Sequence, residues 1–135
     1  AIVGTSTRYY CGENSALQIG SDFGLYYTPY QVYGGVQYDT ISVYKYHVCA
    51  VSQLGDAYCW GEETEALGHQ YTIPPYVALP VDGGYRYVNI WVGFRVTCGL
   101  TTDSILYCWG SNSDGQLGNG DNINYSSPTP VATVQ

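Results

Sequence analysis

The sequence predicts an all-β fold built from repeated four-stranded units, and three observations lead to this prediction. The 135 residues include 16 tyrosines and 17 glycines but only 11% charged residues, a composition that favours strands joined by glycine turns over helices. Gly12, Gly61 and Gly110 lie 49 residues apart, each directly behind a tyrosine- and cysteine-containing segment. Within each period, short runs of strand-forming residues alternate with turn residues, which is typical of a strand-rich repeat.

The predicted strands follow one another at regular intervals along the chain. Tyr9 and Tyr10 begin a more divergent copy of the repeated segment, and this copy ends at Gly12. After it we expect strands at residues 29–33, 36–43, 47–52, 57–60, 76–81, 85–92, 96–101 and 105–109. The turns between them are rich in glycine, aspartate and serine and lie at residues 34–35, 54–56, 83–84 and 102–104. Four strands therefore define each unit.

A four-stranded unit cannot bury both of its faces alone, so neighbouring units must stack on it, and units of this length usually stack radially as propeller blades. We therefore predict four-stranded propeller-type blades in an incomplete propeller of about two and a half blades. The single repeat domain, 1–135, is divided into the end of a first blade with its loop (1–28), a complete blade and loop (29–74), a complete blade with a glycine-rich loop (75–127) and the first strand of a further blade (128–135).

Three stretches carry a resemblance to a known family. Residues 56–61 read DAYCWG, residues 107–120 read YCWGSNSDGQLGNG, and residues 127–131 read SPTPV. These segments resemble repeats of the regulator-of-chromosome-condensation type, and more closely the cysteine-bearing versions found in secreted and cell-surface proteins. The resemblance implies propeller blades. It implies no single activity, since members range from a GTPase exchange factor to bacterial β-lactamase inhibitors, and the shared motif is the blade framework.

The length of the chain bears on how such a propeller closes. Seven blades, the number that the family forms, would need roughly 340 residues at this period, whereas the chain has 135. We therefore expect a longer parent chain, an assembly of several copies, or an open stack. Because an open stack exposes strand edges that recruit further chains, self-assembly is a physical expectation.

Two cysteine pairs recur at matched positions of the two complete units. Cys49 and Cys59 are ten residues apart across a strand, a turn and a strand, as are Cys98 and Cys108. Residues at that separation can face each other in an antiparallel hairpin, at positions suited to a disulfide. We therefore predict both disulfides, and with them an extracellular or cell-surface location. Buried free thiols are the alternative, and a zinc site fits the spacing less well.

Cys11 is the odd cysteine of five. It aligns with Trp60 and Trp109 rather than with a disulfide position. Two interpretations remain, burial where tryptophan would pack or an intermolecular cross-link to another chain, and burial is favoured.

The net charge of −7, with only four lysines and arginines, limits the partners. Nucleic acids and anionic membrane surfaces attract basic residues, so we expect no nucleic-acid binding. A segment needs about 18 apolar residues to span a bilayer, and no apolar run in the sequence approaches that length, so we expect no membrane insertion. A cationic partner is compatible with the acidity.

The sequence contains no recognised catalytic motif, and we expect a protein that is not an enzyme and has no cofactor. His47 is matched by Val96 in the next copy and is interpreted as a structural strand residue. Glu62, Glu63 and Glu65 offer the carboxylates that a glycosidase needs, but a solvated loop is the favoured interpretation.

Four side chains of the glycine-rich loop raise the question of calcium. They are Asp114, Asn119, Asp121 and Asn122. Their spacing does not match the EF-hand pattern, and such residues commonly form turns, so no metal site is expected.

Aromatic and basic residues outside the repeated framework are the candidate binding residues. The set is Tyr44, Lys45, Tyr46, Trp91, Phe94 and Arg95. Apart from Trp91, they lie on the inter-strand turns 44–46 and 93–95, which vary while their flanks repeat, as expected of a recognition face on a constant scaffold. Tyrosine offers a large contact area with few rotatable bonds. The alternative is that these tyrosines simply fill half-exposed strand faces.

These features predict a non-enzymatic extracellular interaction module that binds protein, glycan or another copy of itself through its tyrosine-rich turns. The alternative is a structural, self-assembling subunit of an extracellular fibre or surface layer, joined through blade edges and Cys11. An enzyme is the third interpretation, which a calcium- or Glu62-dependent hydrolytic activity would revive. Asn124 begins an Asn-Tyr-Ser sequon and is a glycosylation acceptor wherever the source has that machinery.

Overall fold

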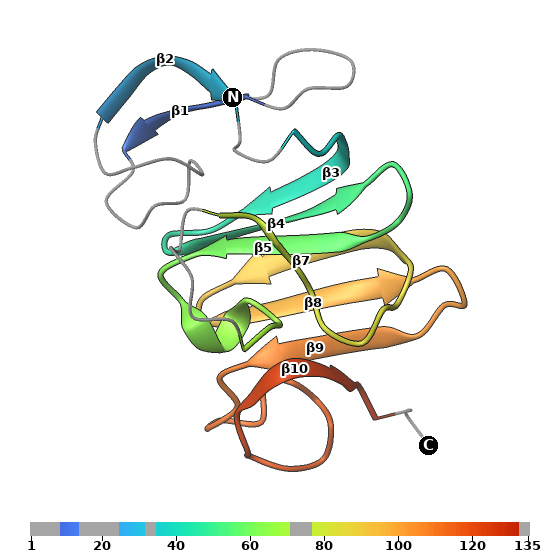
Figure 1. Cartoon of the computed structure of the whole chain (residues 1–135). Coiled ribbons are helices and arrows are strands. Elements are labelled where there is room, and N and C mark those ends of the chain that lie inside the picture. Colours follow the sequence, from blue (N-terminus) through green and yellow to red (C-terminus); the bar gives the residue numbers. More distant parts are fainter. Residues whose placement is uncertain (1–8, 14–24, 32–34, 71–76, 133–135) are drawn as a thin grey trace.

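The strands that the structure describes form three antiparallel sheets that stack in chain order (Figure 1). The computed structural model describes residues 9–13, 25–31, 35–70 and 77–132, with side chains described from residue 31 onward. Apart from the strands, it contains one short 3-10 helix among these residues, η1 (Thr64–Ala66). The predicted all-β fold of propeller-type blades is confirmed.

The strand bounds place each sheet in the sequence. The first sheet pairs β1 (Tyr9–Glu13) with β2 (Leu25–Gln31). The middle sheet contains, in spatial order, β3 (Tyr38–Val43), β4 (His47–Ser52), β5 (Ala57–Gly61) and β6 (Leu79–Pro80). The last sheet contains β7 (Tyr87–Gly93), β8 (Val96–Thr101), β9 (Leu106–Gly110) and β10 (Tyr125–Pro130), in the spatial order β10-β9-β8-β7.

The main core lies between the middle and last sheets. It contains Cys49, Val51, Ala57, Cys59, Leu67, Val81, Tyr87, Ile90 and Trp109. The backbone N–H of Val92 on β7 donates a hydrogen bond to Ser42 Oγ on β3 at 3.0 Å, so the inner strands of the two sheets approach closely. A second cluster, Tyr38, Val48, Ala50 and Trp60, covers the opposite face of the middle sheet. Because side chains alternate between the two faces of a strand, β4 and β5 supply both cores.

Both predicted disulfides are present. Cys49 and Cys59 are directly opposed on β4 and β5, and Cys98 and Cys108 are opposed on β8 and β9. Their Cα atoms are 4.2 and 4.1 Å apart. Each bond therefore joins two neighbouring strands in the middle of a sheet.

The strands are grouped into sheets differently from the predicted blade boundaries. β6, which falls in the predicted segment 75–127, pairs with β5 of the middle sheet. β10, whose C-terminal part falls in the further blade predicted at 128–135, pairs with β9 of the last sheet. Each of the two four-stranded sheets therefore takes its fourth strand from the following period. The reason is that a repeat period fixes the length of a unit but not the strand at which one sheet ends.

The outer face of the last sheet has no covering sheet among the described residues. Trp91, Cys98 and Cys108 are neighbours across β7, β8 and β9, in the row that corresponds to Ser42, Cys49 and Cys59. On the middle sheet this row is turned toward the last sheet, and both cysteines are buried there. The corresponding Trp91 remains 47% exposed. Nor do the described residues contain a helix of the length and apolarity needed to cross a membrane.

Candidate interaction surface

Two hairpin turns lie side by side at one end of the middle and last sheets. They are the β3–β4 turn at 44–46 and the β7–β8 turn at 94–95, which we call the turn face. The rings of Tyr46 and Phe94 are 6.4 Å apart, centroid to centroid. The Lys45 ammonium lies 5.0 Å from the centroid of the Tyr46 ring, within the range of a cation–π interaction. Tyr44 and Phe94 are 45% and 60% exposed. The turn face therefore has a partly exposed aromatic centre with a lysine beside it.

The turns are held from behind by the loops that follow β5 and β9. The N–H of Glu62 donates to the carbonyl oxygen of Tyr46 at 2.9 Å, and the N–H of Ser111 donates to that of Arg95 at 2.8 Å. The N–H of Tyr44 also donates to the carbonyl oxygen of His47 at 3.1 Å, which closes the first turn. These backbone bonds give the exposed rings a fixed support.

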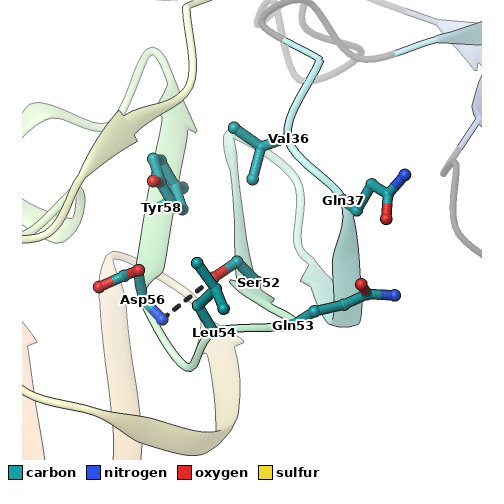
Figure 2. A pocket seen from close by; sticks show the side chains of 7 residues that line it. All are labelled: Val36, Gln37, Ser52, Gln53, Leu54, Asp56 and Tyr58. Carbon is teal, nitrogen blue, oxygen red and sulfur yellow. Dashed lines mark hydrogen bonds between the residues drawn. The ribbon is translucent and has the colours of Figure 1, made fainter.

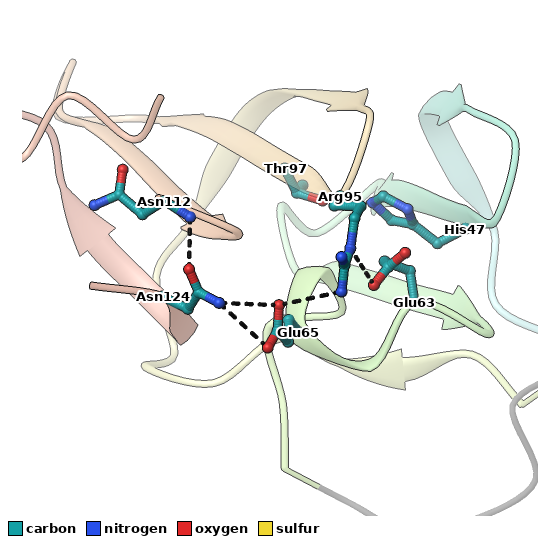
Figure 3. A network of polar contacts seen from close by, with 7 residues as sticks. All are labelled: His47, Glu63, Glu65, Arg95, Thr97, Asn112 and Asn124. Atoms are coloured by element: carbon teal, nitrogen blue, oxygen red, sulfur yellow. Dashed lines mark hydrogen bonds and ion pairs between the residues drawn. The ribbon is translucent and has the colours of Figure 1, made fainter. Parts of the chain in front are cut away.

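Arg95 connects the turn face to the acidic loop (Figure 3). Its Nε donates to Glu63 Oε1 at 3.1 Å, and its Nη2 lies 3.7 Å from Glu65 Oε2. Asn124 Nδ2 approaches the same Glu65 carboxylate at 3.3 and 3.4 Å. Exposed ion pairs contribute little stability, but this network orients the Arg95 guanidinium. Glu63 and Glu65 of the partly exposed acidic loop therefore have partners that are remote in sequence.

His47 is buried beneath the turn face. Its Nε2 lies 2.8 Å from Thr97 Oγ1, and that hydroxyl donates to the carbonyl oxygen of Ala66 at 2.8 Å. Because the hydroxyl has one proton to donate, His47 Nε2 must carry the proton of its own hydrogen bond. Burial lowers the pKa of His47 from 6.5 to about 4. This histidine therefore links the two sheets as a neutral ring, in agreement with a structural role.

The buried His47 predicts a loss of stability in mild acid. Between pH 6.5 and about 4 the unfolded chain binds a proton that the folded chain does not bind, so the free energy of unfolding falls as the pH falls. The change from this group is roughly 3 kcal/mol over the whole interval, and it vanishes above about pH 7.5.

Urea unfolding between pH 7.5 and 4.5 measures this dependence. The variant His47→Val, which copies the matched residue Val96, should show a shallower pH dependence than the parent protein. Equal slopes for the two proteins would contradict the assignment to His47.

The structure brings most of the predicted binding residues together but separates Trp91 from them. Lys45, Tyr46, Phe94 and Arg95 meet at the turn face, with Tyr44 next to them in the same turn. Trp91 lies instead on the outer face of the last sheet, in the row of the Cys98–Cys108 disulfide.

The glycine-rich loop after β9 is organised by a buried asparagine. Asn112 Nδ2 donates to Asn119 Oδ1 and to the carbonyl oxygen and Oδ1 of Asp121, at 3.0 to 3.1 Å. Its Oδ1 accepts the N–H of Leu117 at 2.9 Å. Asn119 and Asp121, two of the residues considered for calcium, therefore build the loop. Among the described residues, no group of three or more histidine, cysteine, aspartate or glutamate side chains is placed to hold a metal ion.

Two further predicted sites have different outcomes. Asn124, the sequon asparagine, is exposed, and its Oδ1 accepts the N–H of Asn112 at 2.8 Å. Its glycosylation stays a prediction. The backbone of Cys11 lies on β1 at an irregularity between Tyr10 and Gly12, but its side chain lies outside the described part of the structure, so both interpretations of its fate stay open.

Two family models match the C-terminal third of the chain. Both are described as the regulator of chromosome condensation (RCC1) repeat, and they match residues 103–135 and 88–116. No curated protein sequence gives a significant match.

Solved structures are similar over nearly the whole chain. Human WBSCR16 has a TM-score of 0.82 at 20% identity, covering 97% of this chain and 34% of its own. Prp20p from Saccharomyces cerevisiae has a TM-score of 0.83 at 18% identity, covering 98% and 36%. The yeast RCC1 (Prp20) bound to Kap60 has a TM-score of 0.81 at 19% identity, covering 94% and 33%. The chain thus spans about a third of the length of these proteins, and at such identities the likeness concerns the fold alone.

Proposed function

We propose that this chain, which carries RCC1-type propeller repeats, is a non-enzymatic interaction module that binds a protein partner through the turn face. The observation that carries the proposal is the meeting of Tyr46 and Phe94 from two different sheets. The half-buried Tyr46 ring and the exposed Phe94 ring form an apolar centre with Lys45 on one side and the Arg95–Glu63 pair on the other. Aromatic and arginine anchors on a rigid support are the usual centre of a protein interface.

Two of the similar structures support a protein partner. Prp20p has binding properties toward Gsp1p and histones, and the yeast RCC1 structure is a complex with Kap60. These partners are properties of those proteins. What supports the proposal here is that RCC1-type blades serve as scaffolds for protein contacts while their loops vary.

The proposal that the module is not an enzyme is supported by the state of His47. Its ring is 1% exposed and engaged with Thr97, so it is turned away from any substrate that would approach from solvent. A catalytic base must come within hydrogen-bond reach of the proton that it removes.

The turn face is tested by comparing two variants as baits. The variant Tyr46→Ser/Phe94→Ser removes both rings, and Ile105→Ser is a matched control that removes an exposed side chain at the opposite end of the strands. Proteins captured by the parent chain and by the control, but not by the turn-face variant, are purified and titrated by calorimetry. We expect the double substitution to weaken binding by more than about tenfold, as for an interface anchor.

Two outcomes would contradict the proposal. One is a partner that binds the parent chain and the turn-face variant equally. The other is specific retention of glycans on an array with no protein partner, which would replace protein by glycan as the ligand class.

We further propose an extracellular or cell-surface location. The two cross-strand disulfides support it, because such bonds persist in oxidising compartments. Peptide mapping of the protein from its source, without reduction, should recover the linked pairs Cys49–Cys59 and Cys98–Cys108. Four unlinked thiols would contradict this location.

A self-assembling structural subunit is the second candidate, and one observation favours it. The outer face of the last sheet exposes Trp91 in the row where the middle sheet is covered by its neighbour. Light scattering after size-exclusion chromatography distinguishes the candidates. A binding module should keep one mass at all concentrations, whereas a fibre subunit should grow with concentration and lose that growth in Trp91→Ser.

A further inference from the structure

A second candidate site lies at the other end of the strands, away from the turn face. It is an open hollow of about 350 Å³ beside the β4–β5 turn, within the size range of small ligand sites. Its lining consists of Val36, Gln37, Ser52, Gln53, Leu54, Asp56 and Tyr58. Figure 2 shows Val36 and Tyr58 facing one another from the two sides of the opening.

In the next repeat, the position that corresponds to this hollow is occupied by a tyrosine side chain. Position 36 corresponds to Tyr85 and position 58 to Tyr107, each pair being 49 residues apart. In the last sheet, Tyr85 stacks on Tyr107 with the ring centroids 4.2 Å apart and the planes inclined by 27°. In the middle sheet, Val36 stands where Tyr85 would be, and the hollow opens beside Tyr58. The difference between the two places is thus the ring of Tyr85, which valine at position 36 lacks.

The filled site also shows how a guest ring would be held. The planes of the two rings are inclined by only 27°, so the contact is made through the faces of the rings. Stacked aromatic pairs contribute about 0.5–1.5 kcal/mol beyond the burial of their surface.

The rim of the hollow is preformed. Ser52 and Asp56 are joined twice, by the Ser52 N–H to the Asp56 carbonyl oxygen at 2.8 Å and by the Asp56 N–H to Ser52 Oγ at 3.1 Å. Arg86 reaches over from the last sheet, donating to the Leu54 carbonyl oxygen at 3.1 Å and pairing with the Asp56 carboxylate. A guest would therefore enter a site whose backbone is already ordered.

We propose that this hollow accepts a tyrosine side chain of a partner protein, which stacks on Tyr58 in the position that Tyr85 takes on Tyr107. The inference goes beyond the proposed function, because the site lies at the opposite end of the strands and does not depend on the turn face. Val36 and Leu54 supply apolar walls, and Gln37 and Gln53 supply amide groups at the mouth for the backbone of the guest.

The experiment uses N-acetyl-L-tyrosinamide as the probe and the whole chain, observed by amide chemical shifts. We expect saturable shifts in the millimolar range at Ser52, Asp56 and Tyr58. Val36→Tyr introduces the residue found at the matched position 85, and it should weaken binding of the probe at least tenfold. N-acetyl-L-leucinamide should also bind at least tenfold more weakly, since it lacks a ring.

The matched variant Tyr85→Val opens the second site. It should create a new saturable set of shifts around Tyr107 while leaving those around Tyr58 in place. If Val36→Tyr does not fold, Tyr58→Leu replaces it, with the same expected loss. The proposal is overturned by probe binding that persists in these closing variants, by the absence of saturable shifts, or by equal binding of methyl β-galactoside, which would indicate a sugar site.

Discussion

Replacing Trp109 by alanine is expected to lower the free energy of unfolding by about 3–5 kcal/mol. Trp109 is fully buried between the middle and last sheets, where its ring meets Tyr87 edge to face at 6.3 Å. Its Nε1 donates to the carbonyl oxygen of Ala66 at 2.9 Å. That oxygen also accepts the Thr97 hydroxyl, so it keeps a partner in the variant, and the loss comes mainly from the cavity. Urea unfolding followed by circular dichroism measures the change.

Trp91→Ala is the matched control. It removes the same side chain from the outer face of the last sheet, where the indole is 47% exposed. The change in unfolding free energy should be clearly smaller than for Trp109→Ala, because about half of the Trp91 side chain is already exposed in the folded state. If Trp109→Ala lost no more than Trp91→Ala, the packing between the two sheets would not be the main source of stability.

The blade framework could be predicted from the sequence because its positions depend on local chemistry. Cysteines ten residues apart across a short turn become direct neighbours in the antiparallel ladder, so Cys49–Cys59 and Cys98–Cys108 followed from spacing alone. The grouping of the strands into sheets could not be predicted from the sequence. β6 and β10 reach their sheets only after long loops, and the repeat period is the same wherever the unit is divided.

The candidate site was predicted in part. The two turns could be paired because they occupy the same place in successive units, and neighbouring blades bring such places side by side. Trp91 was grouped with them because it is an aromatic residue outside the repeated framework, matched by Ser42 in the preceding unit. Alternation along β7 turns it instead to the face of Cys98, opposite the face through which Ile90 packs on the middle sheet. The role of Glu63 could not be predicted without the fold, because its partner Arg95 is 32 residues away in the sequence.

The sequence contains an indication of the hollow beside Tyr58, but it can be interpreted only once the fold is known. Positions 36 and 85 are matched in the repeat, but position 36 has a valine where position 85 has a tyrosine. The unit with Val36 therefore lacks one aromatic ring. Only the structure shows that Tyr85 stacks on Tyr107, and that a hollow opens beside Tyr58 where Val36 takes the place of that tyrosine. In a repeat protein, the differences between matched positions therefore indicate where recognition is to be sought, once the shared positions have defined the scaffold.

Gly110→Ala is expected to destabilise the protein by at least about 3 kcal/mol, since a strained backbone and a steric overlap act together. Gly110 has a φ of +115°, which L-residues with a side chain rarely adopt. A Cβ there would overlap the carbonyl oxygen of Arg95 and lie 3.0 Å from Val96 Cα, and both are backbone atoms that cannot rotate away. The same Arg95 oxygen accepts the N–H of Ser111. The substitution should therefore also displace the turn that presents Phe94.

Gly84→Ala separates the two causes. Its φ of +64° is also positive, but a Cβ there meets no atom within 4 Å, so only the conformational cost of about 1 kcal/mol is expected. Urea midpoints give the stabilities, and the ring resonances of Phe94 report on the turn face. Gly110→Ala should shift those resonances, whereas Gly84→Ala should leave them unchanged. Equal losses of stability in the two variants would mean that the contact behind the β7–β8 turn is loose enough to admit a methyl group, and the turn face would then lack the rigid support on which its proposed role in binding depends.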